Sequence, residues 1–317
     1  MRCDLGGGSL PARLRATAVS LGCIAAVLVA GVGCTPSSGV PAGVISAVGA
    51  ENQYANVIAE VGGRYVQATA VMSNPDTDPH TFEASPSVAR QIADAQLIVQ
   101  NGLGYDTFMN KLEDATGGSS RTVIDVQTLL GLPDSTSNPH VWYAPTTMPA
   151  VAAAVARDLT SLQPAHAAYF HANAMRFDRS LGPWLHAITQ LRTTHPGVPV
   201  ATTEPVANYL LTAAGTDVRT PWALQEDVMN GVDPAPQNVS AQEALISGNQ
   251  VKALLYNRQV TDSLTESLLA LARSHAVPVV AVYETMPTPG YDYQSWMLAE
   301  TNALLAAFDH HRSTSTL

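Results

Sequence analysis

Cysteine is nearly missing from this sequence. The 317 residues include 3 cysteines, and the last of them, Cys34, stands close to the N-terminus. Cys3 and Cys23 lie before or within an apolar run near the start of the chain, and only Cys34 follows that run. The rest of the chain therefore cannot form the disulfide framework on which small secreted folds depend.

Basic residues are also scarce, and long apolar runs do not recur. The chain has 16 Lys and Arg against 26 Asp and Glu, for a net charge of −10. Binding to nucleic acid without sequence preference relies on clustered Lys and Arg that neutralise phosphates. After Cys34, no stretch approaches the roughly 20 apolar residues that a membrane-spanning helix needs. We expect neither nucleic-acid binding nor a membrane span in the body of the chain.

Several catalytic motifs are missing as well. The sequence contains no HExxH, no GxSxG and no glycine loop of the type that binds phosphates. A metallohydrolase would also need an open coordination position for water and a general base. We therefore predict that the protein is not an enzyme, and a metal-dependent hydrolase is kept as an alternative.

The N-terminus has the layout of an export signal. Three arginines precede the apolar run 16–33, which ends in small residues before Cys34. The Gly33-Cys34 pair resembles a bacterial lipoprotein processing site, in which the cysteine becomes the lipidated first residue. We therefore expect a signal peptide over 1–33 and, after a lipidated Cys34, a flexible tether over 34–43 that is rich in Ser, Pro and Gly. The alternative is an uncut membrane helix, because 18 apolar residues are many for a signal.

From residue 44 onward, short β-type runs alternate with helical runs. Such alternation is typical of βα units and parallel sheets. The chain is about twice as long as a typical domain, so we predict an α/β fold with two similar lobes, over 44–164 and 196–317. The strand-like runs are 44–48, 65–72, 96–102, 122–126, 198–204, 251–257 and 277–284.

A long helical stripe, over 165–195, is predicted to connect the two lobes. Its apolar residues, from Phe177 to Leu191, recur at helical spacing. Gly182-Pro183 interrupts the stripe, and proline removes a helix hydrogen bond. We therefore expect either a kink at this point or two shorter helices.

Four side chains that ligate metals follow predicted strands. His80 and His140 come from the first half of the chain, and Glu204 and Glu284 from the second. In parallel α/β sheets, ligands bind outside the carboxyl ends of the strands. Two imidazoles and two carboxylates suit a divalent transition metal, so we predict a metal site in the cleft between the lobes.

Local sequence supports this prediction without proving it. A proline precedes each histidine and restricts the backbone that presents the ring. Asn101, at another strand end, is a candidate partner that holds a ligating imidazole in one tautomer, or else a turn residue before Gly102. Glu204 could instead be a favourable charge at a helix N-terminus, and Glu284 a solvated loop residue.

Four segments resemble one family, the substrate-binding proteins of zinc and manganese ABC importers. They are "NPDTDPHTFEASPSVARQIADAQLIVQNGLGYD" (74–106), "NPHVWYAP" (138–145), "TTEPVANYLLTAAG" (202–215) and "VPVVAVYETMP" (277–287). The resemblance covers nearly the whole chain after the tether. It implies two α/β lobes joined by a long helix, with a metal held between them by residues at the positions of His80, His140, Glu204 and Glu284.

The resemblance also implies a cellular role. The protein would be exported and anchored through Cys34 to the outer face of the cytoplasmic membrane. There, as a monomer, it would capture a metal ion and deliver it to an ABC permease and its ATPase. Some members of this family have been assigned adhesion roles, and a surface adhesion lipoprotein is kept as a further alternative.

Two departures from the family pattern bear on the metal. Glu204 stands where zinc-type members have His and many manganese-type members have Glu, and Glu284 stands where Asp is usual. The chain also has no His-rich tract. These features favour an oxygen-rich site for Mn²⁺ or Fe²⁺, although such a site would still bind Zn²⁺ more tightly in solution. The sequence therefore leaves manganese and zinc both open.

Overall fold

The computed structural model describes residues 43–74, 85–117, 121–287 and 289–317. The predicted signal peptide, Cys34 and His80 lie outside the described residues. All the described residues belong to one compact unit, Val40–Leu317. Among the described helices, none is both long enough and apolar enough to cross a membrane.

The first half of this unit is built on a parallel sheet with strand order β2-β1-β3-β4. The strands are β1 (Ile45–Glu51), β2 (Val66–Met72), β3 (Leu97–Gln100) and β4 (Thr122–Asp125). The helices of this half are α1 (Asn52–Gly62), α2 (Pro86–Ala93), α3 (Thr107–Thr116), α4 (Val126–Leu130) and α5 (Thr147–Leu162). A short 3₁₀ turn, η3 (Val141–Tyr143), follows His140.

The second half repeats the arrangement, with strand order β6-β5-β7-β8 and parallel pairing throughout. Its strands are β5 (Pro199–Thr202), β6 (Asp217–Val218), β7 (Leu254–Asn257) and β8 (Val279–Val282). Its helices are α8 (Asn208–Ala214), α9 (Trp222–Met229), α10 (Pro236–Ser247), α11 (Ser263–Ser274) and α12 (Tyr293–His310). The chain is therefore an α/β protein with two lobes built on parallel sheets, as the sequence predicts.

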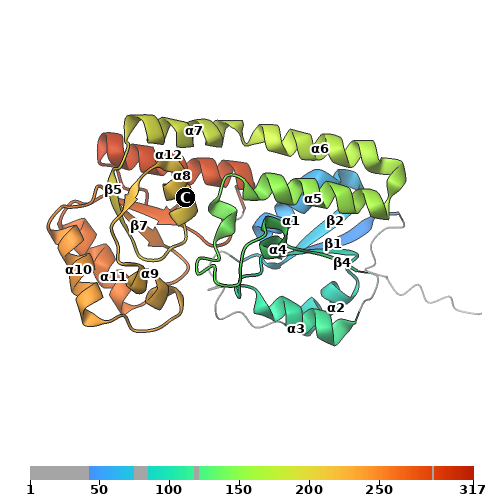
Figure 1. Ribbon diagram of the computed structural model, residues 1–317, viewed down its shortest axis with the longest axis horizontal. Coiled ribbons are helices and arrows are strands. Elements are labelled where there is room, and N and C mark those ends of the chain that lie inside the picture. Colours follow the sequence, from blue (N-terminus) through green and yellow to red (C-terminus); the bar gives the residue numbers. More distant parts are fainter. Residues whose placement is uncertain (1–42, 75–84, 118–120, 288) are drawn as a thin grey trace, which may run out of the picture. The chain divides into compact units, whose positions relative to one another are not determined.

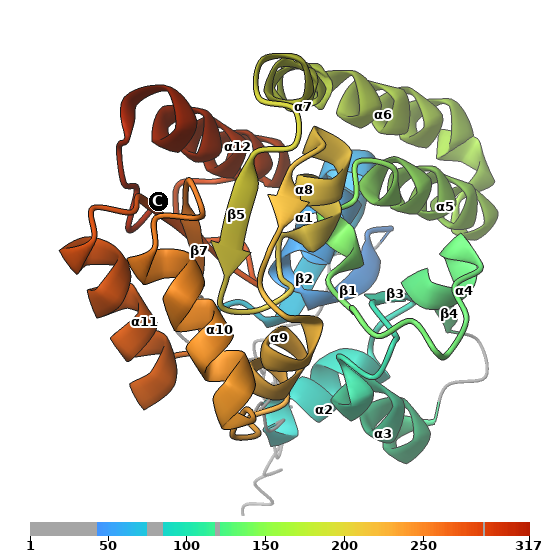
Figure 2. The same ribbon diagram turned by 60° about the vertical axis from the view of Figure 1, so that its left-hand side comes forward.

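Strands β3, β7 and β8 are buried on both faces, which explains why they read as apolar runs. In the first sheet, Val48 and Ile98 pack with Ile92 of α2 and Met109 of α3, while their neighbours along the strands, among them Leu97, pack with α1 and α5. In the second sheet, Leu254 and Tyr256 pack against α10 and α11. Figure 2 shows α10 and α11 side by side against the second sheet, and α2 beside α3 near the first.

Two consecutive helices, α6 (Ala167–Ser180) and α7 (Gly182–Thr194), connect the lobes. Only Leu181 separates them, and Pro183 stands in the first turn of α7, where its missing N–H removes no bond. The predicted interruption at Gly182-Pro183 is thus confirmed as two shorter helices. In Figure 1, α5 packs along α6, and α12 packs along α7. The apolar stripe faces these helices and is buried, except for Leu185, which is 40% exposed.

Candidate metal site

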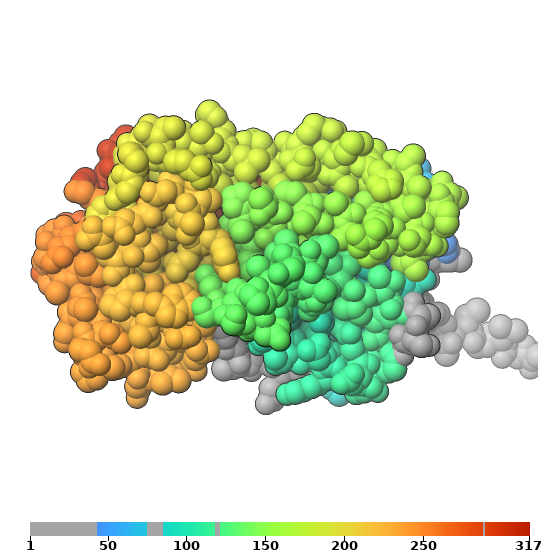
Figure 3. Space-filling view, viewed as in Figure 1, coloured from blue at the N-terminus to red at the C-terminus, as the bar shows by residue number. Residues whose placement is uncertain are grey.

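Polar side chains lie at or just beyond the carboxyl ends of strands in both lobes. Glu51 and Asn257 are the last residues of β1 and β7, Asn101 follows β3, and Glu204 and Glu284 stand two residues beyond β5 and β8. Figure 3 shows the surface where the green segment around residues 130–145 meets the yellow and orange segment that follows β5. All five side chains are buried. Side chains of both lobes thus meet beneath the surface, as the following contacts show.

His140 and Glu284 lie next to each other, although 144 residues separate them in the sequence. The Nε2 atom of His140 is 3.4 Å from Oε2 of Glu284, and both side chains are fully buried. Tyr105 donates its hydroxyl hydrogen to the same carboxylate oxygen at 2.9 Å. The structure therefore brings one predicted histidine from the first lobe to one predicted glutamate from the second.

Glu204 and Glu284 are linked by a residue that the sequence analysis missed. The Nδ2 atom of Asn257 donates to Oε1 of Glu204 at 3.0 Å and to Oε1 of Glu284 at 2.7 Å. Two carboxylates that share a buried site repel each other, and a common amide donor offsets part of that repulsion. The signal that the sequence offered was the position of Asn257 at the end of a predicted strand.

Gln259 shapes the loop that carries Glu284. Its Oε1 accepts hydrogen bonds from the backbone N–H groups of Glu284 at 2.5 Å and Thr285 at 2.8 Å. Its own backbone N–H donates to Oδ1 of Asn257 at 3.0 Å. The turn after β7 thus fixes both the amide that bridges the carboxylates and the backbone of one of them.

Asn138 orients the ring of His140. Its Nδ2 donates to the carbonyl of Pro205 at 2.9 Å, so its Oδ1 is the atom that faces His140 Nδ1 at 2.8 Å. An acceptor at this position places the ring hydrogen on Nδ1 and leaves Nε2 with its lone pair, which is the form of imidazole that binds metals. Trp142 and Tyr105 pack edge-on against the ring at 5.3 and 5.8 Å between ring centres.

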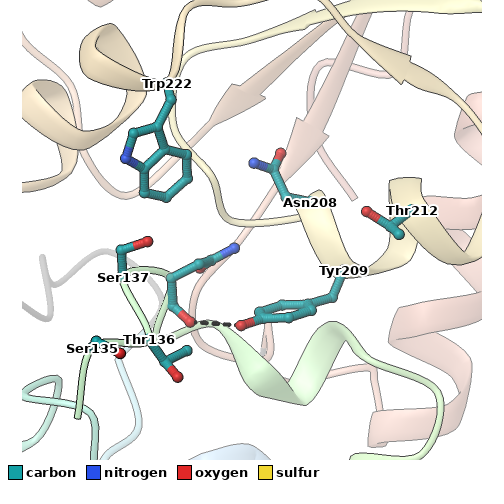
Figure 4. Close-up of a pocket in the computed structure, with 8 residues that line it drawn as sticks. Ser135, Thr136, Ser137, Asn208, Tyr209, Thr212 and Trp222 are labelled. Atoms are coloured by element: carbon teal, nitrogen blue, oxygen red, sulfur yellow. Dashed lines mark hydrogen bonds between the residues drawn. The ribbon is translucent and has the colours of Figure 1, made fainter. Parts of the chain in front are cut away.

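Asn138 lines a surface pocket between the two lobes, and Figure 4 shows other residues that line this pocket. Tyr209 of α8 donates its hydroxyl hydrogen to the backbone carbonyl of Asn138 at 2.9 Å. Trp222 and Asn208 of the second lobe line the same pocket, opposite the segment 135–137 of the first. The loop that presents His140 is therefore held by residues of the other lobe.

Asn101 acts on the backbone near His140. Its Nδ2 donates to the carbonyl of Pro139 at 2.9 Å, and its Oδ1 accepts from the hydroxyl of Tyr54 at 2.6 Å. The atom opposite the imidazole Nδ1 belongs to Asn138 instead. Asn101 thus lies beside the peptide bond between Pro139 and His140. The side chain that holds the ring of His140 is that of Asn138.

Burial and like charges perturb the carboxyl groups of this region. Burial raises the pKa of Glu51 well above its ordinary value, and the charges of Asp106 and Glu284 raise it further. Burial also raises the pKa of Asp106 to about 7, although the backbone N–H groups of Asn101 and Gly102 lower it. The region between the lobes therefore gathers carboxyl groups whose charged forms are disfavoured by burial and by one another, and a bound cation would favour the charged forms.

Over the described ranges, no group of three or more His, Cys, Asp or Glu side chains is already arranged as a set of metal ligands. The predicted ligand His80 lies outside these ranges, so the complete predicted set is not covered by this observation.

A comparison with protein families decides where the chain belongs. The model of the family described as zinc-uptake complex component A, periplasmic (ZnuA) matches residues 48–307, which is most of the chain. The chain belongs to the ZnuA family. The family consists of substrate-binding proteins that bind metal ions.

Two curated proteins are similar to parts of this ZnuA-family chain. A protein of Thermotoga maritima described as metal-binding is 31% identical over 94 residues, which are 30% of this chain and 33% of that protein. The manganese-binding lipoprotein MntA of Bacillus subtilis is 24% identical over 136 residues, 41% of this chain and 44% of that protein. The chain thus matches less than half the length of either.

Solved structures share the fold over nearly their whole length. The Mn-bound periplasmic metal-binding protein of Candidatus Liberibacter asiaticus superposes with a TM-score of 0.69 at 16% identity, covering 83% of this chain and 98% of that one. The substrate-binding protein FpvC of Pseudomonas aeruginosa in complex with Ni²⁺ gives 0.68 at 17% identity, covering 86% and 98%. The two-lobed architecture is therefore that of periplasmic metal-binding proteins.

Proposed function

We propose that this protein is the extracytoplasmic metal-binding component of an ABC importer, which captures Mn²⁺ or Zn²⁺ and delivers it to a membrane permease and its ATPase. The observation that carries the proposal is the buried meeting of His140, Glu284 and Glu204 across the two lobes, with Asn257 between the carboxylates. Membership of the ZnuA family supports it.

The metal ligands in this proposal are His80, His140, Glu204 and Glu284. The tautomer that Asn138 imposes directs the lone pair of His140 Nε2 towards Glu284. Each lobe contributes ligands, so a bound cation would stabilise the closed arrangement of the lobes. In line with the family, we assign these residues to binding, with no catalytic role.

The proposal includes export and anchoring. Residues 1–33 serve as a signal peptide, and Cys34 carries the lipid that holds the protein at the outer face of the cytoplasmic membrane. The tether 34–43 leads to lobes over 44–164 and 196–317, joined by 165–195, and the protein acts as a monomer. MntA of Bacillus subtilis, which matches part of this chain, is a lipoprotein, and this supports the anchor.

Calorimetric titration of the chain without residues 1–33 tests the site. Mn²⁺ and Zn²⁺ are expected to bind in one-to-one stoichiometry, and His80→Ala, His140→Ala, Glu204→Ala and Glu284→Ala are each expected to weaken binding. His186→Ala is the matched control, because His186 lies exposed on α7. Binding by the four variants as tight as that of the control would refute the assignment.

The transport role needs a cellular measurement. Deletion of the gene is expected to lower the accumulation of manganese or zinc by cells grown at limiting metal. The parent gene should restore accumulation, whereas the His140→Ala gene should not. Unchanged accumulation after deletion, together with tight binding in vitro, would leave the binding site standing and reject the import role.

A further inference from the structure

Glu51 is a buried carboxylate that the predicted ligand set does not include. It is the last residue of β1, at the carboxyl edge of the first sheet, and it has no exposed surface. Neither Oε1 nor Oε2 has a hydrogen-bond partner among the described residues. Buried polar groups are nearly always paired, and an unpaired buried carboxylate is costly. Because no described residue pairs with this carboxylate, the structure points to a bound ligand as its partner.

The residues after Glu51 hold it against the loop that carries Glu284. Asn52 donates from Nδ2 to the carbonyl of Met286 at 2.7 Å and accepts from the N–H of Met286 at 2.9 Å. Gln53 donates to the backbone carbonyl of Glu284 at 3.2 Å. The two residues that follow Glu51 in the first lobe thus contact the loop that follows β8 of the second.

The backbone before Glu51 is fixed as well. A methyl group on Gly49 would lie 2.3 Å from the backbone nitrogen of Ala55, because β1 runs directly into α1 at this point. The carboxylate of Glu51 is therefore attached to a rigid junction between strand and helix. Sites on such junctions hold their ligands more accurately than sites on long loops.

The charges around Glu51 also point to a cation. Its neighbours include the carboxylates of Asp106 and Glu284, which interact with it electrostatically. Asp106 already accepts hydrogen bonds from the backbone N–H groups of Asn101 and Gly102. Glu284 accepts from Tyr105 and Asn257. Among Glu51, Asp106 and Glu284, Glu51 is thus the one whose two carboxylate oxygens accept no hydrogen bond from the described residues.

We propose that Glu51 is a third carboxylate of the metal site, which supplies an oxygen to a divalent cation held by His140, Glu204 and Glu284. This inference rests on the function proposed above. The side chain has to rotate towards the cation, as the other ligands do, since no preformed ligand cluster exists among the described residues.

A third carboxylate alters the preference of the site. Zn²⁺ favours four ligands in a tetrahedron, whereas oxygen-rich sites with more ligands suit Mn²⁺. An additional oxygen from Glu51 therefore stabilises Mn²⁺ more than Zn²⁺. Glu51 is in this sense a residue that determines specificity.

The variant Glu51→Gln tests the inference, because it removes the charge and keeps the size. Glu300→Gln is the matched control: Glu300 is equally buried, and its oxygens are occupied by Trp296 and Tyr143. In a competition titration, Glu51→Gln is expected to weaken Mn²⁺ binding about tenfold or more and Zn²⁺ binding less. The ratio of manganese to zinc affinity should therefore fall in Glu51→Gln and stay unchanged in Glu300→Gln.

Three outcomes separate this inference from the proposed function. If the parent binds both metals and the two variants retain the same affinity ratio, the role of Glu51 is overturned and the function stands. If the parent binds neither metal, both are overturned. If Glu51→Gln does not fold, a crystal structure of the parent with Mn²⁺ decides: a Glu51 oxygen within about 2.6 Å of the ion supports the inference, and one beyond about 4 Å overturns it.

Discussion

Asn138 lies directly behind His140, with its Oδ1 atom 2.8 Å from Nδ1 of the ring. The same oxygen accepts the backbone N–H of His140 at 3.1 Å. The side-chain amide of Asn138 therefore fixes both the backbone and the tautomer of His140, a proposed ligand. Glu284 of the second lobe lies on the other side of the ring.

The first prediction concerns this contact. Asn138→Ala is expected to weaken Mn²⁺ and Zn²⁺ binding by about 10- to 100-fold, because the ring loses the acceptor that sets its tautomer and orientation. Calorimetric titration measures the change. Asn208→Ala, which alters the same surface pocket without contacting the ring, should bind both metals as the parent does. Equal affinities in the two variants would contradict the role of Asn138.

The second prediction concerns the amide between the two glutamates. Asn257→Asp replaces the shared donor by a third negative charge beside Glu204 and Glu284, so the free energy of unfolding should fall by about 3 kcal/mol or more. Urea unfolding at neutral pH measures it. Asn302→Asp makes the same chemical change at an exposed position of α12 and should shift stability by less than about 0.5 kcal/mol.

The third prediction concerns the contact between the lobes at Asn52. Asn52→Ala removes two buried hydrogen bonds and leaves the backbone N–H and carbonyl of Met286 without these partners. A loss of about 2 kcal/mol or more in the free energy of unfolding is expected. The comparison variant is Asn302→Ala. A loss below about 0.5 kcal/mol in Asn52→Ala would show that this contact does not stabilise the fold.

The fourth prediction concerns pH. Burial raises the pKa of Glu300 from 4.5 to about 8, although donors from Tyr143 and Trp296 lower it. Between pH 4.5 and about 8, the folded protein therefore keeps a proton on Glu300 that the unfolded chain releases. The stability that Glu300 contributes is thus fully present below pH 4.5 and is lost as the pH rises towards 8. Glu300→Gln mimics the protonated group and should not lose this stability.

Unfolding by urea at pH 5, 6, 7 and 8 checks this expectation. A rise of one unit in pKa corresponds to about 1.4 kcal/mol. The free energy of unfolding of Glu300→Gln should therefore increase by more than about 2 kcal/mol relative to that of the parent between about pH 5 and 8. Glu266→Gln, on the exposed face of α11, should show no such gain. A parallel pH dependence of parent and Glu300→Gln would rule out a buried proton on Glu300.

Much of the fold could be predicted because strands β3, β7 and β8 are buried on both faces. The strands then stand out as apolar runs, and seven of the eight coincide with runs recognised in the sequence. β6 has only two residues, Asp217 and Val218, which is too short to show a period.

Two residues of the proposed site, His140 and Glu284, could be selected from the sequence because their side chains are types that bind metals. Asn138 and Asn257 could not be recognised in the same way, since an asparagine in a loop or at a strand end usually serves a turn. Glu51 is not among the site residues predicted from the sequence. The case for Glu51 rests on the lack of a hydrogen-bond partner for its carboxylate among the described residues, and only the structure reveals this.

The matching strand orders of the two lobes imply an internal quasi-symmetry. Glu51 at the end of β1 corresponds to Glu204 after β5, and Asn101 after β3 corresponds to Asn257 at the end of β7. Duplication of one such half would already bring two glutamates and two asparagines to a shared interface. His140 has no counterpart among these four positions, so the two halves share the carboxylates and amides at the interface, and the first half supplies the imidazole.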